Sequence, residues 1–254
     1  MESVERKKFI DRDMIKYLAV IPMGIGHFCG YLSGGTLYAD MPFWVFFIMH
    51  AALFAPPVFF FFIAEGFRYT RSRKRYALRL LVFALINQIP FCLANYGTLL
   101  TVEFFLNWNI IFTLFLGLLA LLVWESGKKL PVRIVLIVLI DIVTVLLSSE
   151  WMIFGVLLIL GFHVFHDKPR ARLVWFLCTI SAMQLVIAVL SFCGWFYTIA
   201  ALVIETSSML LAYYLVTHHY SGEKGRHPVF AKWFFYLFYP LHLWAIYVIG
   251  IFIS

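Results

Sequence analysis

Several apolar runs in this chain reach about 20 residues, the length that a helix needs to cross the hydrocarbon core of a bilayer. Backbone N–H and C=O groups cannot bond to water inside lipid, so such runs have to form helices. Composition agrees, because 13% of the 254 residues are charged, against about a quarter in a typical soluble domain. The sequence therefore predicts an all-α fold, a polytopic transmembrane helical bundle in contact with the lipid bilayer.

The positions of Lys and Arg predict the topology. Apart from Lys16 and Arg79, they fall in the amino-terminal tail, at the ends of predicted spans or in alternate loops. Because basic residues collect on the cytoplasmic side, the amino terminus is expected inside and the carboxyl terminus outside, with about nine spans. The net charge of +7 then reflects topology, and no nucleic-acid partner is expected. We expect residues 1–254 to form a single integral membrane domain, whose second span is broken at Pro56-Pro57.

No metal site is predicted. The cysteines all lie in apolar segments, form no CxxC or Cys/His spacing, and are interpreted as small core residues: Cys29, Cys92, Cys178 and Cys193. The histidines near the predicted inner ends and loops have no spacing that compels metal binding.

Lys16 and His27 lie eleven residues apart on the first predicted span, from Asp13 to about Ser33. Eleven residues turn a helix through about 1100° and raise it by about 16 Å, so both side chains share one stripe. We hypothesise that they hold the two ends of one elongated substrate, with the His27 imidazole as general base. The alternatives are a Lys16 that extends to the inner surface and a His27 hydrogen-bonded within the bundle.

Further polar residues lie in or beside the other spans. Asn107 and Asn109 open the fourth predicted span and are candidates to orient an acceptor or stabilise an oxyanion. His242 in the last span is another candidate catalytic residue. Helix capping and hydrogen bonds between helices are the alternatives for these three. The mid-span acids Asp141 and Glu205 are expected to face the bundle interior.

A dense run of cations follows the second predicted span. Six of them lie within twelve residues: Arg68, Arg71, Arg73, Lys74, Arg75 and Arg79. Such a run is typical of a strong anion site. The phosphates of a nucleotide-like cofactor fit it, and anionic lipid headgroups are the competing ligand.

Five stretches resemble, in this order, the motifs of the TraX family: KYLAVIPMGIGHF, PVFFFFIAEGFRYTR, RYALRLLVFALINQIPF, NIIFTLFLG and FYPLHL. That family is named for conjugal-pilin acetylation and is related to the acyltransferase-3 type of membrane acyltransferases. The resemblance implies an enzyme of the bacterial plasma membrane. Its reaction would be transfer of an acetyl or other acyl group from cytoplasmic acetyl-CoA to an extracytoplasmic acceptor, an amine or hydroxyl of a protein, glycan or lipid.

The resemblance also implies roles for individual residues. Lys16 and His27 match the spacing of a basic residue, ten residues and a His in acyltransferase-3 proteins, which implies that His27 is the general base or acyl carrier. The Arg-rich turn resembles a coenzyme-binding element, so the expected ligands of acetyl-CoA are Lys16, Arg68, Arg71, Arg75 and Arg79. Gly26 stands where the family often has Asp, and the alternatives for an orienting group of His27 are Asp141, Glu205 and Asn109.

Two other function classes remain open on the sequence alone. One is a transporter or flippase for an anionic solute, which would use the same cations together with the mid-span acids. The other is a non-catalytic assembly partner in an envelope complex. The acceptor, the acyl length and the oligomeric state, including a homo-oligomer, are also left open.

Overall fold

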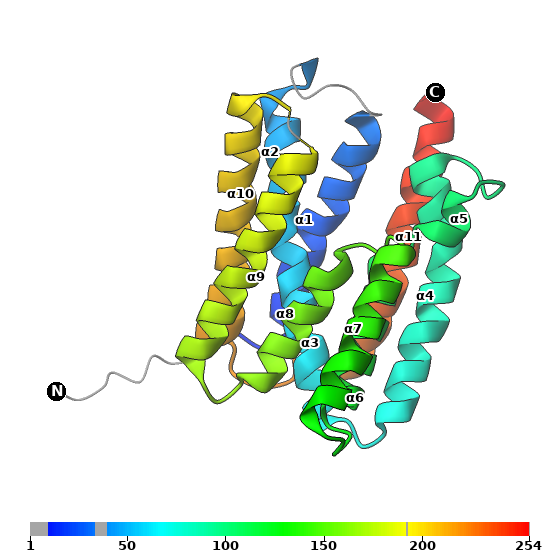
Figure 1. Ribbon diagram of the computed structural model, residues 1–254. Coiled ribbons are helices and arrows are strands. Elements are labelled where there is room, and N and C mark those ends of the chain that lie inside the picture. Colours follow the sequence, from blue (N-terminus) through cyan, green and yellow to red (C-terminus); the bar gives the residue numbers. More distant parts are fainter. Residues whose placement is uncertain (1–9, 34–39, 192, 254) are drawn as a thin grey trace. The chain divides into compact units, whose positions relative to one another are not determined.

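A computed structural model describes residues 10–33, 40–191 and 193–253 of the chain (Figure 1). These residues are helical or in turns, apart from an isolated backbone bridge between Ile10 and Tyr220. The predicted all-α class is therefore confirmed for the described part of the chain. Most of the charged amino-terminal tail and of the first predicted outer loop, residues 1–9 and 34–39, lies outside the described residues.

The chain forms two compact units, and each is described by itself. Unit 1 contains the described residues up to Phe59 together with Cys193–Phe238, and unit 2 contains those from Phe60 to Ser191 together with Tyr239–Ile253. Two helices, α3 (Ala55–Tyr69) and α11 (Pro228–Ile253), begin in unit 1 and continue in unit 2.

In unit 1, helices α1 and α10 pack against the same helical segment. Both α1 and α10 pack against α2 and the 3-10 segment η2 that follows it. A short π-helical stretch, η3, ends α10. The bounds of these elements are α1 Arg12–Ser33, α2 Phe43–Ala51, η2 Ala52–Phe54, α10 Trp195–Tyr214 and η3 Leu215–His219.

Unit 2 is built around α6, which packs against α4, α7 and α8, while α9 packs against α8 (Figure 1). Gly117 of α6 lets Ile159 of α8 approach, since a Cβ there would lie 2.3 Å from Ile159 Cδ1. The bounds are α4 Arg73–Tyr96, α5 Glu103–Leu106, α6 Ile110–Trp124, α7 Leu130–Leu146, α8 Met152–Val164 and α9 Pro169–Leu190.

Six helical segments among the described residues are long and apolar enough to cross a membrane: Phe43–Tyr69, Arg73–Tyr96, Glu103–Trp124, Pro169–Leu190, Trp195–His219 and Pro228–Phe252. They fit a multi-pass membrane protein. The shorter apolar helix Met152–Val164 is too short for the same criterion. The count of nine spans and the orientation of the two termini stay predictions.

The expected break at Pro56-Pro57 is a single 3-10 turn, η2, inside the continuous helical segment Phe43–Tyr69. In an α-helix the N–H groups of residues 56 and 57 would bond to the carbonyls of Ala52 and Leu53, but both donors belong to prolines and are missing. The Ala55 N–H instead bonds to the Ala52 carbonyl in the shorter 3-10 pattern. The break therefore lies on the amino-terminal side of the prolines, which occupy the first turn of α3.

Gly26 is a point of close approach between α1 and η2. A Cβ built on Gly26 would lie only 2.3 Å from the Cβ of Ala52, and its next neighbours are ordinary contacts at 3.7 and 3.8 Å. The Asp that the TraX pattern often places before the His therefore has no room here. The absence of a side chain at this position is a packing requirement of unit 1.

Replacing Gly26 by Ala is expected to lower the stability of the folded protein by about 1–3 kcal/mol, because the added methyl group overlaps Ala52. Thermal unfolding of the detergent-solubilised variant measures the loss.

The double variant Gly26→Ala with Ala52→Gly removes the overlapping methyl group, so most of the lost stability should return. A double variant that is no more stable than Gly26→Ala would contradict this account of the crossing. Gly30→Ala is the matched control, because a Cβ there would meet only Met49 Cε at 3.8 Å.

Candidate functional site

Lys16 and His27 both lie on α1 in unit 1, and both residues are partly exposed. α1 is one helix over both positions, so their spacing corresponds to about 16 Å along its axis. The Lys16 ammonium lies 5.5 Å from the centre of the Phe235 ring of α11, a cation–π contact. His27 directly follows the Gly26 crossing. Their proposed roles at the two ends of a substrate stay predictions.

Glu205 is buried in unit 1, as expected of a mid-span acid. Its Oε1 atom lies 2.6 Å from Nδ1 of His50, so the pair joins α10 to α2. The other two alternatives for orienting His27, Asp141 of α7 and Asn109 before α6, lie in unit 2.

Asn109 and Gln88 form a buried amide network at the start of α6 in unit 2. Asn109 Nδ2 donates to Gln88 Oε1 and to the Ala84 carbonyl, both at 2.9 Å, and Asn109 Oδ1 accepts the Ile111 N–H at 3.1 Å. Gln88 Nε2 donates to the Asn107 carbonyl at 2.6 Å. Asn109 is therefore the N-cap of α6, the alternative that the sequence left open, and it binds α6 to α4.

Glu150, in the turn between α7 and α8, extends this polar region. Its Oε2 atom accepts the Ile110 N–H at 2.7 Å and the Tyr239 hydroxyl at 3.3 Å. The Tyr239 ring packs against that of His242, with centroids 5.3 Å apart. One chain of contacts thus leads from the Asn109 cap through Glu150 to His242, so unit 2 brings the predicted Asn and His candidates into one region.

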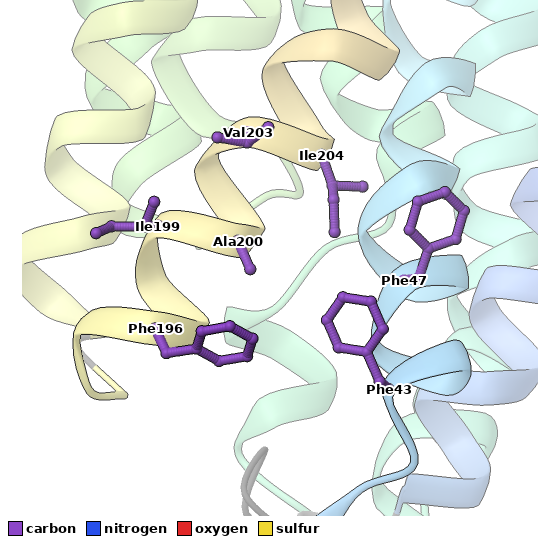
Figure 2. A pocket seen from close by; sticks show the side chains of 7 residues that line it. All are labelled: Phe43, Phe47, Phe196, Ile199, Ala200, Val203 and Ile204. Carbon is purple, nitrogen blue, oxygen red and sulfur yellow. The ribbon is translucent and has the colours of Figure 1, made fainter.

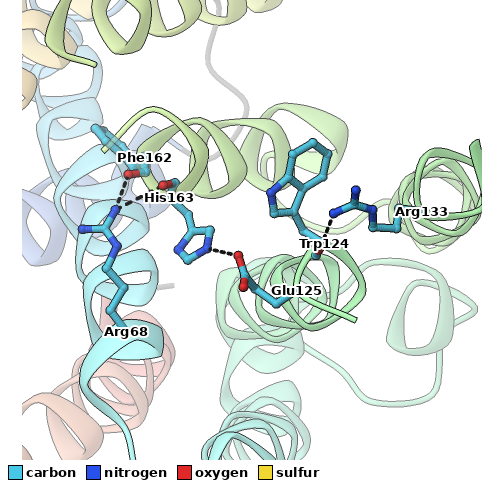
Figure 3. Close-up of polar contacts among 6 residues, drawn as sticks. All are labelled: Arg68, Trp124, Glu125, Arg133, Phe162 and His163. Atoms are coloured by element: carbon cyan, nitrogen blue, oxygen red, sulfur yellow. Dashed lines mark hydrogen bonds and ion pairs between the residues drawn. The ribbon is translucent and has the colours of Figure 1, made fainter. Parts of the chain in front are cut away.

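Arg68 is held by the carboxyl-terminal end of α8 (Figure 3). Its Nη2 donates to the Phe162 carbonyl at 2.9 Å and the His163 carbonyl at 3.3 Å, and Nη1 bonds to Nδ1 of His166. Burial, and next the Arg68 cation, lower the pKa of His166, so its neutral ring can accept this bond. Arg68 therefore caps carbonyls that α8 leaves without helical partners.

Other cations at the same helix ends have similar contacts. Arg133 donates to the Trp124 carbonyl at 2.7 Å, and the His163 Nε2 atom lies 2.9 Å from Glu125 Oε1 (Figure 3). Arg133 therefore caps a carbonyl at the end of α6 as Arg68 does for α8, whereas the His163–Glu125 contact joins the ends of α8 and α6 through two side chains.

The remaining predicted coenzyme ligands of unit 2, Arg71, Arg75 and Arg79, are exposed around the start of α4. The first turn of α4 contains no acidic residue, although it contains Arg73, Lys74 and Arg75. A helix amino terminus carries partial positive charge, so cations there raise the electrostatic energy and an anion lowers it. Arg68 is already committed to the end of α8, and binding of coenzyme phosphates by Arg71, Arg75 and Arg79 stays a prediction.

Comparison with known proteins bears on both units. The TraX protein family matches the chain over residues 11–250, which include Lys16, His27 and His242. The chain belongs to the TraX family. A relative from Dichelobacter nodosus, "Probable fimbrial assembly protein FimC, serogroup H1", is 30% identical over 240 residues, which cover 90% of this chain and 91% of that protein. No solved structure matches the chain.

Sequence reasoning missed four polar residues that this TraX protein places in its interior contacts: His50, Gln88, Glu150 and Tyr239. Gln88 interrupts an apolar span, and an amide there has to find partners, which is a signal that the sequence does contain. Glu150 was not among the predicted site residues. No local pattern predicts its contacts, because Ile110 and Tyr239 lie 40 and 89 residues away.

The Glu150 carboxyl group is enclosed by protein atoms, although the residue as a whole is partly exposed. Burial raises its pKa from 4.5 to about 7, while the hydrogen bonds from Ile110 and Tyr239 act in the opposite direction. In the folded TraX protein the group is therefore protonated over a pH range in which the unfolded chain is ionised.

Replacing Asn109 by Ala is expected to lower stability by about 2–3 kcal/mol, because α6 loses its cap and the Gln88 amide loses a buried partner. Asn107→Ala is the matched control and should cost about 1 kcal/mol or less, since Gln88 bonds to the Asn107 backbone carbonyl, which the variant keeps. Thermal unfolding of both variants measures the difference. Equal losses would contradict the capping role.

Glu150→Gln is expected to change how stability depends on pH. The raised folded pKa stabilises the wild type fully below about pH 4.5, and this stabilisation is lost as the pH rises through 7. Relative to the variant, the wild type should lose about 2 kcal/mol between pH 5 and pH 8. Unfolding curves across this range measure the shift, and parallel pH profiles for the two proteins would contradict the enclosed, protonated carboxyl.

Proposed function

We propose that the chain is a membrane-embedded acyltransferase, which moves an acetyl group from cytoplasmic acetyl-CoA to an amine or hydroxyl of an extracytoplasmic acceptor. The observation that carries the proposal is its membership of the TraX family over residues 11–250, because that family is linked to pilin acetylation. Within residues 11–250, helix α1 carries both the Lys16 cation and the His27 imidazole.

The exposed cations around the start of α4 bind the phosphates of acetyl-CoA in this proposal. Arg71 and Arg75 are exposed, carry permanent charge and lie where the helix dipole also favours an anion. Lys16 is the further cation of the proposed site, and it lies on α1 in unit 1.

His27 acts as the general base or the acyl carrier. As a base, its imidazole takes the proton of the acceptor nitrogen or oxygen as that atom bonds to the thioester carbonyl carbon; the C–S bond then breaks, and the proton passes to the departing coenzyme A thiolate. As a carrier, an imidazole nitrogen first bonds to the acetyl carbon while the C–S bond breaks and the thiolate leaves; the acceptor then displaces the imidazole from the acetyl group, and its proton goes to the thiolate. Asn107 and His242 are proposed to stabilise the oxyanion or orient the acceptor within unit 2. Asn109 supports this region through its cap, because both hydrogens of its amide are donated to Ala84 and Gln88.

His27→Ala is expected to lower acetyl-CoA turnover by about 10²–10⁴-fold, the range that a positioned acid–base group contributes. The assay is release of free coenzyme A thiol by purified protein in nanodiscs. Protein that neither binds nor hydrolyses acetyl-CoA, and that is unchanged by His27→Ala, would refute the proposal.

The double variant Arg71→Ala with Arg75→Ala should raise the KM for acetyl-CoA by about tenfold or more, equivalent to about 1.4 kcal/mol of lost binding. Lys128→Ala with Lys129→Ala is the matched control, since it removes two exposed cations from the turn before α7 and should leave KM unchanged. An equal rise of the KM in both double variants would indicate that positive charge attracts acetyl-CoA without a specific site.

A second candidate function is a non-catalytic partner in envelope assembly, favoured by the name of the Dichelobacter nodosus relative, a probable fimbrial assembly protein. The two functions differ in what Lys16 and His27 do. A stable partner recovered equally well with wild-type protein and with the Lys16→Ala, His27→Ala double variant, together with no acetyl-CoA turnover, would support assembly.

A further inference from the structure

Asp141 is an acid within α7 that differs in its contacts from the other acids of the two units. Its Oδ1 atom is buried and has no hydrogen-bond partner among the described residues. The hydroxyl one turn further along α7, that of Thr144, donates to the Asp141 backbone carbonyl at 2.6 Å, so its hydrogen is not available to the carboxyl group. Glu205 and Glu150, by contrast, both have hydrogen-bond partners inside their units.

Asp141 lies at the edge of the exposed side of α7. Residues three or four positions apart lie on the same side of a helix. On one side of Asp141, Ile137 and Thr144 are buried, whereas on the other Val138 and Val145 are 49% and 45% exposed. Asp141 itself is partly exposed. A group from outside this chain can therefore approach its carboxyl group.

The exposed side of α7 is apolar. Six side chains around Asp141 are between 45% and 67% exposed: Val135, Val138, Leu139, Ile142, Val145 and Leu146. α7 packs against α8 and against α6, which belongs to a segment apolar enough to span a membrane. In a bilayer this side of α7 meets lipid chains, which offer neither a hydrogen-bond donor nor an opposite charge. The acid at its edge therefore lacks a partner that another protein can supply.

An apolar groove of about 430 Å³ lies between α2 and α10 in unit 1, and it does not raise the same requirement. Figure 2 shows Phe43 and Phe47 of α2 across from Phe196 and Ile204 of α10, and the other residues that line the groove are apolar too. Lipid chains can fill such a groove without leaving a polar group unsatisfied. The groove therefore gives no reason to expect a protein partner, whereas the side of α7 that carries Asp141 does.

The charge of Asp141 selects among the possible partners. A second copy of the chain, inserted in the same orientation and related by two-fold symmetry, presents the same surface and brings acid toward acid. A helix with a Lys or Arg at the depth of Asp141 supplies the opposite charge and hydrogen-bond donors, and both charged groups are then paired between the helices. That depth is about 8 Å from the end of α7 at Leu146, counted at about 1.5 Å per residue.

We propose that the exposed side of α7 around Asp141 binds a transmembrane helix of another protein, which carries a Lys or Arg that faces Asp141. The apolar side chains of α7 pack against that helix, and the Asp141 carboxylate accepts hydrogen bonds from the ammonium or guanidinium group. This surface lies outside the residues assigned to acyl transfer above. The inference therefore does not depend on that function.

The test measures the binding of a synthetic helix to the full-length protein in proteoliposomes of phosphatidylcholine. The probe is a peptide with an apolar run of about 20 Leu and Ala residues and a single Lys at the depth of Asp141. The control peptide has Leu in place of that Lys. Energy transfer between a fluorophore on the protein and one on the peptide reports the bound fraction. The Lys peptide should bind at least about tenfold more tightly than the Leu peptide.

Asp141→Asn should remove this preference, so that the variant binds the Lys peptide about tenfold more weakly than the wild type does. Glu150→Gln is the matched control, because it removes a carboxyl group of unit 2 that protein atoms enclose, and it should keep the preference. Asp141→Lys should prefer a peptide with Asp in place of the Lys, since the charges of the pair are then reversed.

Asp141→Leu separates binding from folding. Because it removes an unpartnered polar group from an apolar surface, the variant alone should unfold at the same temperature as the wild type or at a higher one. A lower unfolding temperature would assign Asp141 to the stability of the fold and would overturn the proposal.

Three binding results would also overturn it. One is equal binding of the Lys and Leu peptides to the wild type, or no binding of either. Another is a preference for the Lys peptide that Asp141→Asn keeps, because the cation then has a different partner. The third is self-association of the wild type that Asp141→Asn abolishes, which would assign this side of α7 to a second copy of the chain.

Discussion

Polar groups among the apolar helices must find their partners inside the protein, since lipid offers none. In unit 2 this constraint centres on Gln88, whose amide bonds to the Phe104 and Asn107 carbonyls and to Asn109. A single side chain of α4 therefore fixes the turn that leads into α6. Because α4, α7 and α8 all pack around α6, the placement of most of unit 2 depends on this buried amide pair.

The helices and the break at Pro56-Pro57 could be predicted because both follow from local chemistry: apolar runs long enough for a span, and two missing backbone donors. Runs of charged residues predicted the ends of the helices less well. The dense run of cations was expected to follow the second span, yet Arg68 still belongs to α3 and α4 already begins at Arg73. The Ser72 side chain accepts the Arg75 N–H as the N-cap of α4. A dense run of charged side chains indicates a segment exposed to water or ions. An exposed helix end meets this requirement as well as a loop does.

The pairings could not be predicted, because they depend on which helices meet. The sequence predicts Glu205 as an acid that faces the bundle interior, but nothing in it marks His50 as the partner. Only the packing of α2 on α10 joins the two residues. The role of Gly26 also depends on which helices meet, so it could not be predicted from the sequence. Compared with the family pattern it marks a missing carboxylate, whereas the contact with Ala52 shows that the crossing of α1 and η2 excludes any side chain there.

The cationic run also shows how geometry divides residues that composition groups together. Arg68 is committed to the carbonyls at the end of α8, so its charge offsets the negative end of that helix dipole. Arg71 and Arg75 have no such role in the contacts described, and they lie at the positive end of α4, where their charge adds to the dipole. The six cations therefore differ in their contacts: Arg68 caps α8, and Arg73 and Arg79 lie over the Phe67 and Tyr76 rings. Arg71 and Arg75 form the second group, whose charge at the start of α4 is opposed by the helix dipole unless an anion binds. That second group is the physical reason to look for a phosphate ligand at the start of α4.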